Sequence, residues 1–357
     1  MNIKLLELHR EQLCLAYYRI SAIKLSDNRL NEVRNAIGTI CSYMAKVDFE
    51  LEKPSELYEY RNAISLLQEW VGLIANQEHG TKPHSFIHCL NIAAEEWIAD
   101  YWQFIFVATD GVFGIYADHP SSELILQWLY DKFKVLINYR LVHIQIPYHL
   151  DDDYIFNICL YHELGHFIDD QLRITEGMAE DIARKWRRSN PSFAIARNAI
   201  WDKDIRLMQR QIQEIFADVF AAQYVGNSII EYLTFFYEER MNEHDSSHPC
   251  AKLRISMIQD LMRSANDNSI INELNNSLMT ICSKTMSRRY AHEGLILTGG
   301  KCIFSPIETI HKVFELAWTT YYHHTLNVGD STSESYMKTC RATESAIVDS
   351  MNYHNNH

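Results

Sequence analysis

Residues that form turns are scarce in this chain, and their scarcity limits the folds open to it. The 357 residues include only 12 Gly and 7 Pro. An all-β sandwich or barrel needs a turn about every 8 to 12 residues, and a long disordered linker would be rich in proline and polar residues. We therefore expect a mainly helical protein. At this length, with 47% apolar residues, it can bury a core without disulfide or metal crosslinks.

Helical spacing of apolar residues extends over most of the chain. It predicts helices through residues 1–80. One of them runs from about residue 54 to 76, and Ser26 or Asp27 should cap the N-terminus of the helix before it. It also predicts helices within residues 84–135, whereas the polar end of the chain from Asn352 should fray. We expect three regions: an N-terminal helical region (1–80), a core (81–262) and a C-terminal helical region (263–357).

One segment has the two-residue periodicity of a strand instead. Val142, Ile144 and Ile146 alternate with two polar residues, and Pro147 ends the run. The expected fold class is therefore mainly α with a small sheet (α+β).

Charge and cysteine usage exclude several classes of protein. The chain has 33 Lys and Arg against 46 Asp and Glu, a net charge of −13, which disfavours nucleic acids as partners. No apolar run approaches the roughly 18 residues of a membrane-spanning helix, so no membrane insertion is expected, and Glu7, Arg10 and Glu11 interrupt any signal peptide. Eight cysteines without a Cys-x-x-Cys pair indicate reduced thiols. These features predict a cytoplasmic protein.

The motif that carries chemistry is His162-Glu163-Leu164-Gly165-His166, on a helix that Asp151 to Asp153 should open. Two histidines four residues apart share one helix face and can reach one tetrahedral zinc ion. Glu163 would stand beside the metal, where it can take a proton from a zinc-bound water. The surrounding helix is apolar on nearly all sides, which predicts burial, and buried imidazoles need partners.

A catalytic zinc site needs a third protein ligand. A metzincin would have Gly and His at the positions of Asp169 and Leu172, so that pattern fails. A later helix, between Asp202 and Gly226, carries Glu214 and Asp218 on one face. Glu214 fits as the ligand, and Asp218 fits as the acceptor that orients a ligand imidazole.

Two rival ligands lie closer along the sequence. Glu176 and Glu180 follow His166 by ten and fourteen residues. That separation leaves little chain for a second helix to return to the metal, so they rank behind Glu214.

These residues together resemble the gluzincin metallopeptidases. The pattern of His162 to His166, then Glu214-Ile-Phe-Ala-Asp218, then His248-Pro249 with Arg254, is most similar to the prenyl-protein (CAAX) and heat-shock membrane peptidases. The second element also resembles the repressor-cleaving peptidases of mobile elements. The resemblance covers about residues 140–262, and this chain lacks the spanning helices of the membrane members.

The resemblance implies a zincin-like catalytic core with one catalytic zinc ion. It implies His162, His166 and Glu214 as metal ligands, Glu163 as general base and Asp218 as the residue supporting a ligand. It also implies that the strand Leu141–Ile146 is an edge strand above the metal, to which an extended peptide could add.

The oxyanion of the reaction needs a further donor besides the metal. His248 is the first candidate and Arg254 the second. Alternatively, His248 caps a helix that Pro249 begins, and Arg254 forms a salt bridge with a carboxylate such as Asp218.

The expected function is that of a zinc-dependent endopeptidase acting on a protein or peptide substrate. The flanking helices would restrict access, select the substrate or receive a regulatory partner. Two alternatives stay open: a catalytically silent, zinc-containing binding or sensing module, and a metal hydrolase of a non-peptide bond.

Overall fold

The computed structural model describes 15 stretches of the chain, and its helices and strands form two compact units. The units comprise Met1–Ile87 with Ala99–Asp152, and His88–Ile98 with Asp153–His357. The units change over after residues 87, 98 and 152, whereas the three regions expected from the sequence meet at residues 80 and 262. The described residues are 2–25, 27–77, 84–98, 103–111, 114–116, 122–147, 150, 153–189, 198–237, 241, 248–263, 269–287, 303–304, 307–321 and 333–356.

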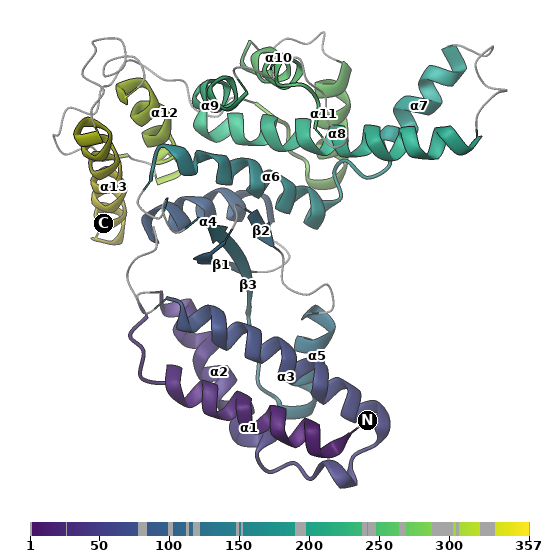
Figure 1. Ribbon diagram of the computed structural model, residues 1–357, viewed down its shortest axis with the longest axis vertical. Helices are drawn as coiled ribbons and strands as arrows, with labels where there is room; N and C mark the ends of the chain where they lie inside the picture. Colours follow the sequence, from purple (N-terminus) through teal and green to yellow (C-terminus); the bar gives the residue numbers. More distant parts are fainter. Residues whose placement is uncertain are drawn as a thin grey trace. The chain divides into compact units, whose positions relative to one another are not determined.

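The first unit contains helices packed around an apolar core, together with a small sheet (Figure 1). The side chain of Asp27 accepts the backbone N–H of Arg29 and caps the second helix, which confirms one of the two predicted caps. Pro54 begins the third helix, where its missing N–H costs nothing. The helices are α1 (Ile3–Ile20), α2 (Asn28–Met44), α3 (Pro54–Ala75) and α5 (Ser122–Phe133), with a 3-10 turn at Phe49–Leu51.

The sheet has three strands in the order β1-β3-β2. β1 (Gln103–Asp110) runs parallel to β3 (Tyr139–Ile146) along its whole length, and β2 (Gly114–Tyr116) pairs antiparallel with β3 opposite residues 143–145. The predicted strand therefore exists. The expectation that it is an edge strand is wrong, because it lies in the middle of the sheet.

The strand β1 also corrects the prediction of helices throughout residues 84–135. Its residues from Phe104 to Ala108 are all buried. A strand buried on both faces has a continuous apolar run, and periodicity alone cannot distinguish such a run from a buried helix.

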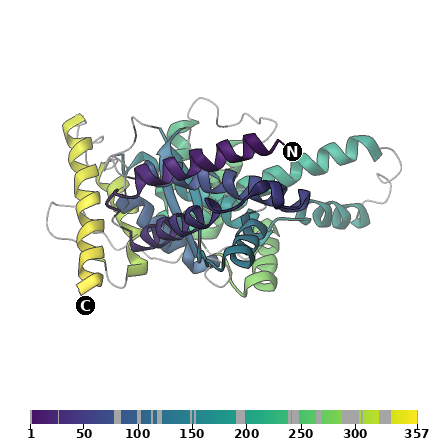
Figure 2. The ribbon, with the colours of Figure 1, turned by 90° about the horizontal axis from the view of Figure 1, so that it is seen from below.

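The second unit is helical in its described part (Figure 1). α8 begins at Asn198, before the expected cap at Asp202, and ends at Val225, where Gly226 takes a φ of +60°. The chain does not fray from Asn352, because one helix continues to Asn356 (Figure 2). The helices are residues 88–98 of α4 (His84–Ile98), α6 (Cys159–Leu172), α7 (Met178–Ser189), α8 (Asn198–Val225), α9 (Ser228–Phe236), α10 (Ala251–Met262), α11 (Ser269–Cys282), α12 (Lys312–Trp318) and α13 (Ser333–Asn356).

An aspartate begins the segment that leads into α6. The carboxylate of Asp153 accepts the backbone N–H groups of Ile155 and Phe156, as an N-terminal cap does. Tyr336 of α13 donates its hydroxyl to the same carboxylate, and Trp318 of α12 donates its indole N–H to the carbonyl of Ile155. The start of the motif helix is thus fixed by two elements from the end of the chain.

The helices α6 and α8 lie side by side (Figure 1), and their backbones are in close contact where Gly165 meets Ala217. A Cβ atom on Gly165 would stand 2.7 Å from the Cα of Ala217 and 3.1 Å from its carbonyl oxygen. Backbone cannot yield as the end of a side chain can, so only glycine fits here. The contact lies between His162 and His166 on one helix.

None of the helices in the described part of the chain combines the length and the apolar character that crossing a bilayer requires.

Replacing Gly165 with alanine should force α6 away from α8. We expect a loss of about 1–3 kcal/mol in the free energy of unfolding, as for other overpacked sites, measured by urea denaturation. The control is Gly72→Ala on the exposed face of α3, where nothing lies within 4 Å of the new methyl group. It should gain about 0.5–1 kcal/mol, because alanine favours a helix interior over glycine. Equal effects of the two substitutions would contradict this packing.

Candidate metal centre

Three side chains from α6 and α8 meet at one point. His162 and His166 stand one turn apart on α6, and their Nε2 atoms are 3.1 Å from each other. Glu214 of α8 places Oε2 3.4 Å from His162 Nε2 and Oε1 3.4 Å from His166 Nε2. These three residues are a group able to hold a metal ion among the described residues.

The spacing of these atoms suits a small divalent cation. Zinc binds nitrogen and carboxylate oxygen at about 2.0–2.2 Å, so two ligands of a tetrahedral ion lie roughly 3.3–3.5 Å apart. The two Nε2 atoms are 3.1 Å apart and each lies 3.4 Å from one of the two oxygens of Glu214, which is close to that value. Glu214 Oε2 is also buried and accepts no hydrogen bond from the described residues. A cation would satisfy this oxygen, so the residues present fit the ion.

A second carboxylate orients the first histidine. The Nδ1–H of His162 donates to Asp218 Oδ1 over 2.9 Å. This bond keeps a proton on Nδ1, so once Nε2 has lost its own proton its lone pair faces Glu214 and His166, which is the tautomer a metal ligand needs. Glu214 and Asp218, four residues apart on α8, therefore act on the same imidazole from one helix face.

A buried arginine holds that carboxylate in turn. Arg254 of α10 donates from Nε to Asp218 Oδ2 over 2.6 Å and from Nη2 to Oδ1 over 2.7 Å. Asp218 is fully buried and Arg254 is 4% exposed. Such a two-point pair has fixed geometry. It is the salt bridge with Asp218 that was the alternative role expected for Arg254.

The electrostatics of the cluster follow from these contacts. Burial would lower the pKa of His162, but the neighbouring carboxylates of Asp218 and Glu214 outweigh burial and raise the pKa to about 9. Burial would raise the pKa of Asp218, but Arg254 lowers it to about 2. The pKa of Glu214 is held well below its usual range by His162 and His166 against the effect of burial. Without a metal, His162 is therefore a cation at neutral pH, with a proton on each ring nitrogen.

The structure places one further sequence candidate, His248, beside this cluster, and a second, Glu163, next to a ligand along α6. Glu163 follows His162 on α6 and is partly buried, and no hydrogen bond or ion pair to another described residue engages its carboxylate. His248 is 40% exposed, with Nε2 3.5 Å from Glu214 Oε1. The expectation that His248 caps a helix is wrong, because α10 begins at Ala251 with Cys250 at the N-cap.

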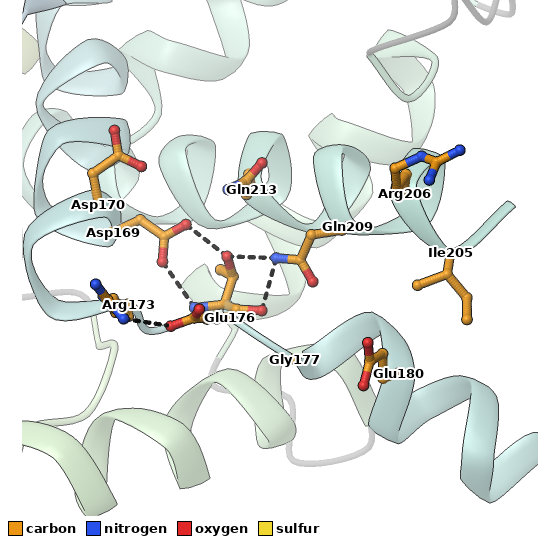
Figure 3. A pocket seen from close by; sticks show the side chains of 11 residues that line it. Asp169, Asp170, Arg173, Glu176, Gly177, Glu180, Ile205, Arg206, Gln209 and Gln213 are labelled. Carbon is orange, nitrogen blue, oxygen red and sulfur yellow. Dashed lines mark hydrogen bonds and ion pairs between the residues drawn. The ribbon is translucent and has the colours of Figure 1, made fainter. Parts of the chain in front are cut away.

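The rival ligands lie elsewhere. Glu176 and Glu180 line a pocket beyond the C-terminal end of α6 (Figure 3). Neither belongs to the ligand group found among the described residues.

Two residues that support the motif helix are not among those expected from the sequence. Gly165 permits the contact with α8, and a glycine inside a helical pattern was the available signal. Tyr161, on the other side of the helix from the ligands, makes a 2.6 Å hydrogen bond with Nδ1 of the buried His311. No local pattern indicates this pair, because 150 residues separate its members.

The affinity for zinc should rise with pH. At pH values below about 9, zinc must displace the proton of His162, so one proton leaves for each ion bound. We expect the apparent Kd to fall about tenfold per pH unit between pH 6.5 and 8, measured by competition with a chromophoric chelator. Without metal, the stability of the fold has the opposite pH dependence. The protonated imidazole stabilises the fold fully below about pH 6.5, and this stabilisation is lost as the pH rises through 9. An affinity independent of pH would contradict the protonated cluster.

Removing the charge of Asp218 should damage both the fold and the metal site. Asp218→Asn leaves the buried Arg254 with only the more distant Glu214, 3.9 Å away, as a counter-charge, so the free energy of unfolding should fall by about 3 kcal/mol. Zinc affinity should fall about 10- to 100-fold, because His162 loses its charged acceptor. The control is Asp181→Asn, whose partner Arg184 and own side chain are more than half exposed. It should cost at most about 1 kcal/mol and leave zinc affinity unchanged. Both variants are measured by urea denaturation and by chelator competition. An Asp218→Asn variant with wild-type stability and wild-type zinc affinity would contradict this assignment.

Comparison with known proteins adds no assignment to this geometry. No protein-family model matches the chain, and neither a curated protein nor a solved structure matches it. The function of the site is therefore inferred from its residues and their arrangement.

Proposed function

We propose that this chain is a zinc-dependent endopeptidase with a zincin-like catalytic core of the gluzincin type. The observation that supports this most is the convergence of His162, His166 and Glu214 at metal-ligand spacing, with one buried oxygen that lacks a hydrogen bond. Three protein ligands are typical of a catalytic zinc site, whereas structural sites have four.

A bound zinc ion would supply a water of lowered pKa and would polarise the carbonyl of the substrate. Glu163 is the general base: its carboxylate accepts the proton of the attacking water and then delivers it to the leaving amine. No hydrogen bond or ion pair with another described residue engages this carboxylate, which supports this role. A non-catalytic zinc module would not need this carboxylate.

The supporting residues have separate roles. Asp218 keeps the proton of His162 on Nδ1, and Arg254 holds Asp218 in place. Arg254 is a positioning residue in this proposal and not an oxyanion donor, since Nε and Nη2 already donate to Asp218. His248 is the donor to the oxyanion, because its ring is partly exposed beside Glu214.

The proposed substrate is a protein or peptide, and the proposed compartment is the cytoplasm. None of the seven described cysteines forms a disulfide, which fits a reducing environment. Peptide addition to β3 is not part of the proposal, because β1 and β2 flank that strand. The sequence-based expectation that the flanking helices control access remains a hypothesis.

Replacing Glu163 with glutamine should separate catalysis from metal binding. The amide cannot accept the proton, so peptide hydrolysis should fall by at least about 100-fold, as for loss of a general base. Zinc content should stay that of the wild type. The measurement is mass spectrometry of a proteome-derived peptide mixture incubated with zinc-loaded protein, beside zinc analysis of each preparation.

The matched control is Asp181→Asn, which makes the same change of acid to amide on the exposed face of α7. It should keep full activity. Equal cleavage by wild type and Glu163→Gln, or no cleavage by zinc-loaded wild type, would contradict the proposed function.

A further inference from the structure

Four aromatic side chains of the second unit form one continuous cluster. The ring of Phe236 stacks on Tyr232 with the centroids 5.5 Å apart, and Phe156 meets Tyr232 edge to face at 5.3 Å. Phe236 also lies 6.1 Å from Phe156 and 5.8 Å from Tyr237. We call these four residues the aromatic surface. Phe156 belongs to the turn before α6, Tyr232 and Phe236 belong to α9, and Tyr237 directly follows α9.

The aromatic surface is open to solvent. Phe236 is 57% exposed, and the other three rings are partly exposed. Single exposed apolar residues are common, whereas apolar side chains gathered in one exposed patch mark binding sites. Because each ring contacts another, the surface is preformed.

The aromatic surface approaches the metal centre along α6. Burial raises the pKa of the Cys159 thiol, and the hydroxyl of Tyr232 and the carboxylate of Glu163 are both close enough to this thiol to affect its pKa. Cys159 and Glu163 are four residues apart, so they share one face of α6. Glu163 directly follows the ligand His162. Tyr232 therefore lies beside α6 one helical turn before the proposed general base.

A second contact joins the aromatic surface to the metal centre through α10. The guanidinium carbon of Arg254 lies 5.9 Å from the ring centroid of Tyr237. The same arginine holds Asp218, and its Nη2 lies 3.9 Å from Oε2 of the ligand Glu214. The aromatic surface thus borders the proposed site from two helices, which favours a substrate as its occupant.

The size of the aromatic surface fits one side chain. Only Phe236 among its four rings is more than half exposed. A stable protein–protein interface covers about 800 Å² on each partner, whereas one aromatic side chain buries about 150–250 Å². The rings already present meet edge to face or stacked, and these are the arrangements in which a further ring would bind.

We propose that the aromatic surface is a specificity site that receives an aromatic side chain of the substrate near the cleaved bond. The inference rests on the proposed peptidase function and names the class of peptide on which the site acts. An aromatic ring gains a ring-to-ring contact with Phe236 in addition to the burial that an aliphatic side chain also gains. A charged side chain would lose water here and find no ion-pair partner among the four rings.

The test compares cleavage sites in a defined peptide mixture. The probe is a tryptic digest of a proteome, in which aromatic and aliphatic residues both occur at internal positions. Zinc-loaded wild type, Glu163→Gln, Phe236→Ala and Phe236→Leu are each incubated with it, and the new termini are sequenced by mass spectrometry. Zinc content and urea denaturation are measured for every variant.

The matched control is Phe235→Ala. Phe235 is 56% exposed, almost the same as Phe236, and it stands next to Phe236 in α9. Adjacent side chains of a helix point about 100° apart, and Phe235 makes no ring contact with another described residue. The control therefore removes the same apolar side chain from the same helix end without touching the aromatic surface.

Wild type should cleave peptides in which phenylalanine, tyrosine and tryptophan are enriched over leucine and isoleucine at one position near the new terminus. Phe236→Ala should reduce this enrichment about fivefold, which corresponds to about 1 kcal/mol for a lost ring-to-ring contact. Phe236→Leu, which keeps apolar area but has no ring, should also reduce it. Phe235→Ala should keep the enrichment of the wild type. Zinc content should be the same in all of these proteins.

Four outcomes would overturn the inference. Cleavage that depends on Glu163 but shows no aromatic preference refutes the specificity site and leaves the peptidase intact. Full aromatic preference in Phe236→Leu refutes the ring-to-ring contact. An equal loss of preference in Phe235→Ala and Phe236→Ala shows that the aromatic surface does not select the substrate. Absence of Glu163-dependent cleavage refutes the proposed function and the specificity site with it.

Discussion

The contact between Gly165 and Ala217 is the constraint on which the candidate site depends. At this point the backbones of α6 and α8 approach so closely that no side chain fits between them. His162 and His166 stand on either side of the glycine, and Glu214 and Asp218 stand on either side of the alanine. A larger separation would move the imidazoles away from the carboxylates. The geometry of the ligands is thus set by backbone packing and not by long side chains reaching across a gap.

Around that contact, positively and negatively charged side chains alternate, so that each buried charge lies beside an opposite one. Arg254 neutralises Asp218, Asp218 orients His162, and His162 and His166 face Glu214. Burying one of these groups alone would be costly, whereas each here has an opposite charge or a donor beside it. Glu214 Oε2 has His162 Nε2 3.4 Å away and Arg254 Nη2 3.9 Å away, but it is buried and accepts no hydrogen bond from the described residues. A divalent cation would complete the series, and His162 would release its proton to admit it.

The local parts of this arrangement could be predicted from the sequence, because they depend on spacing along one helix. His162 with His166, and Glu214 with Asp218, are each four residues apart, and helical geometry puts each pair on one face. The sequence predicts a helix where β1 lies, because a buried strand and a buried helix share a continuous apolar pattern. The placement of β3 between two strands depends on long-range pairing. The bond from Tyr161 to His311 joins residues 150 apart, for which the sequence holds no local signal.

The central claim is that three residues from two helices hold one divalent ion. The most direct test is the metal content of purified protein, measured by inductively coupled plasma mass spectrometry for wild type, His162→Ala and Glu214→Ala, with circular dichroism to establish that each variant is folded. We expect one zinc ion per wild-type chain and little or none in the two folded variants. Wild-type protein that binds no zinc when supplied with it, or folded variants that bind zinc as tightly as wild type, would contradict it.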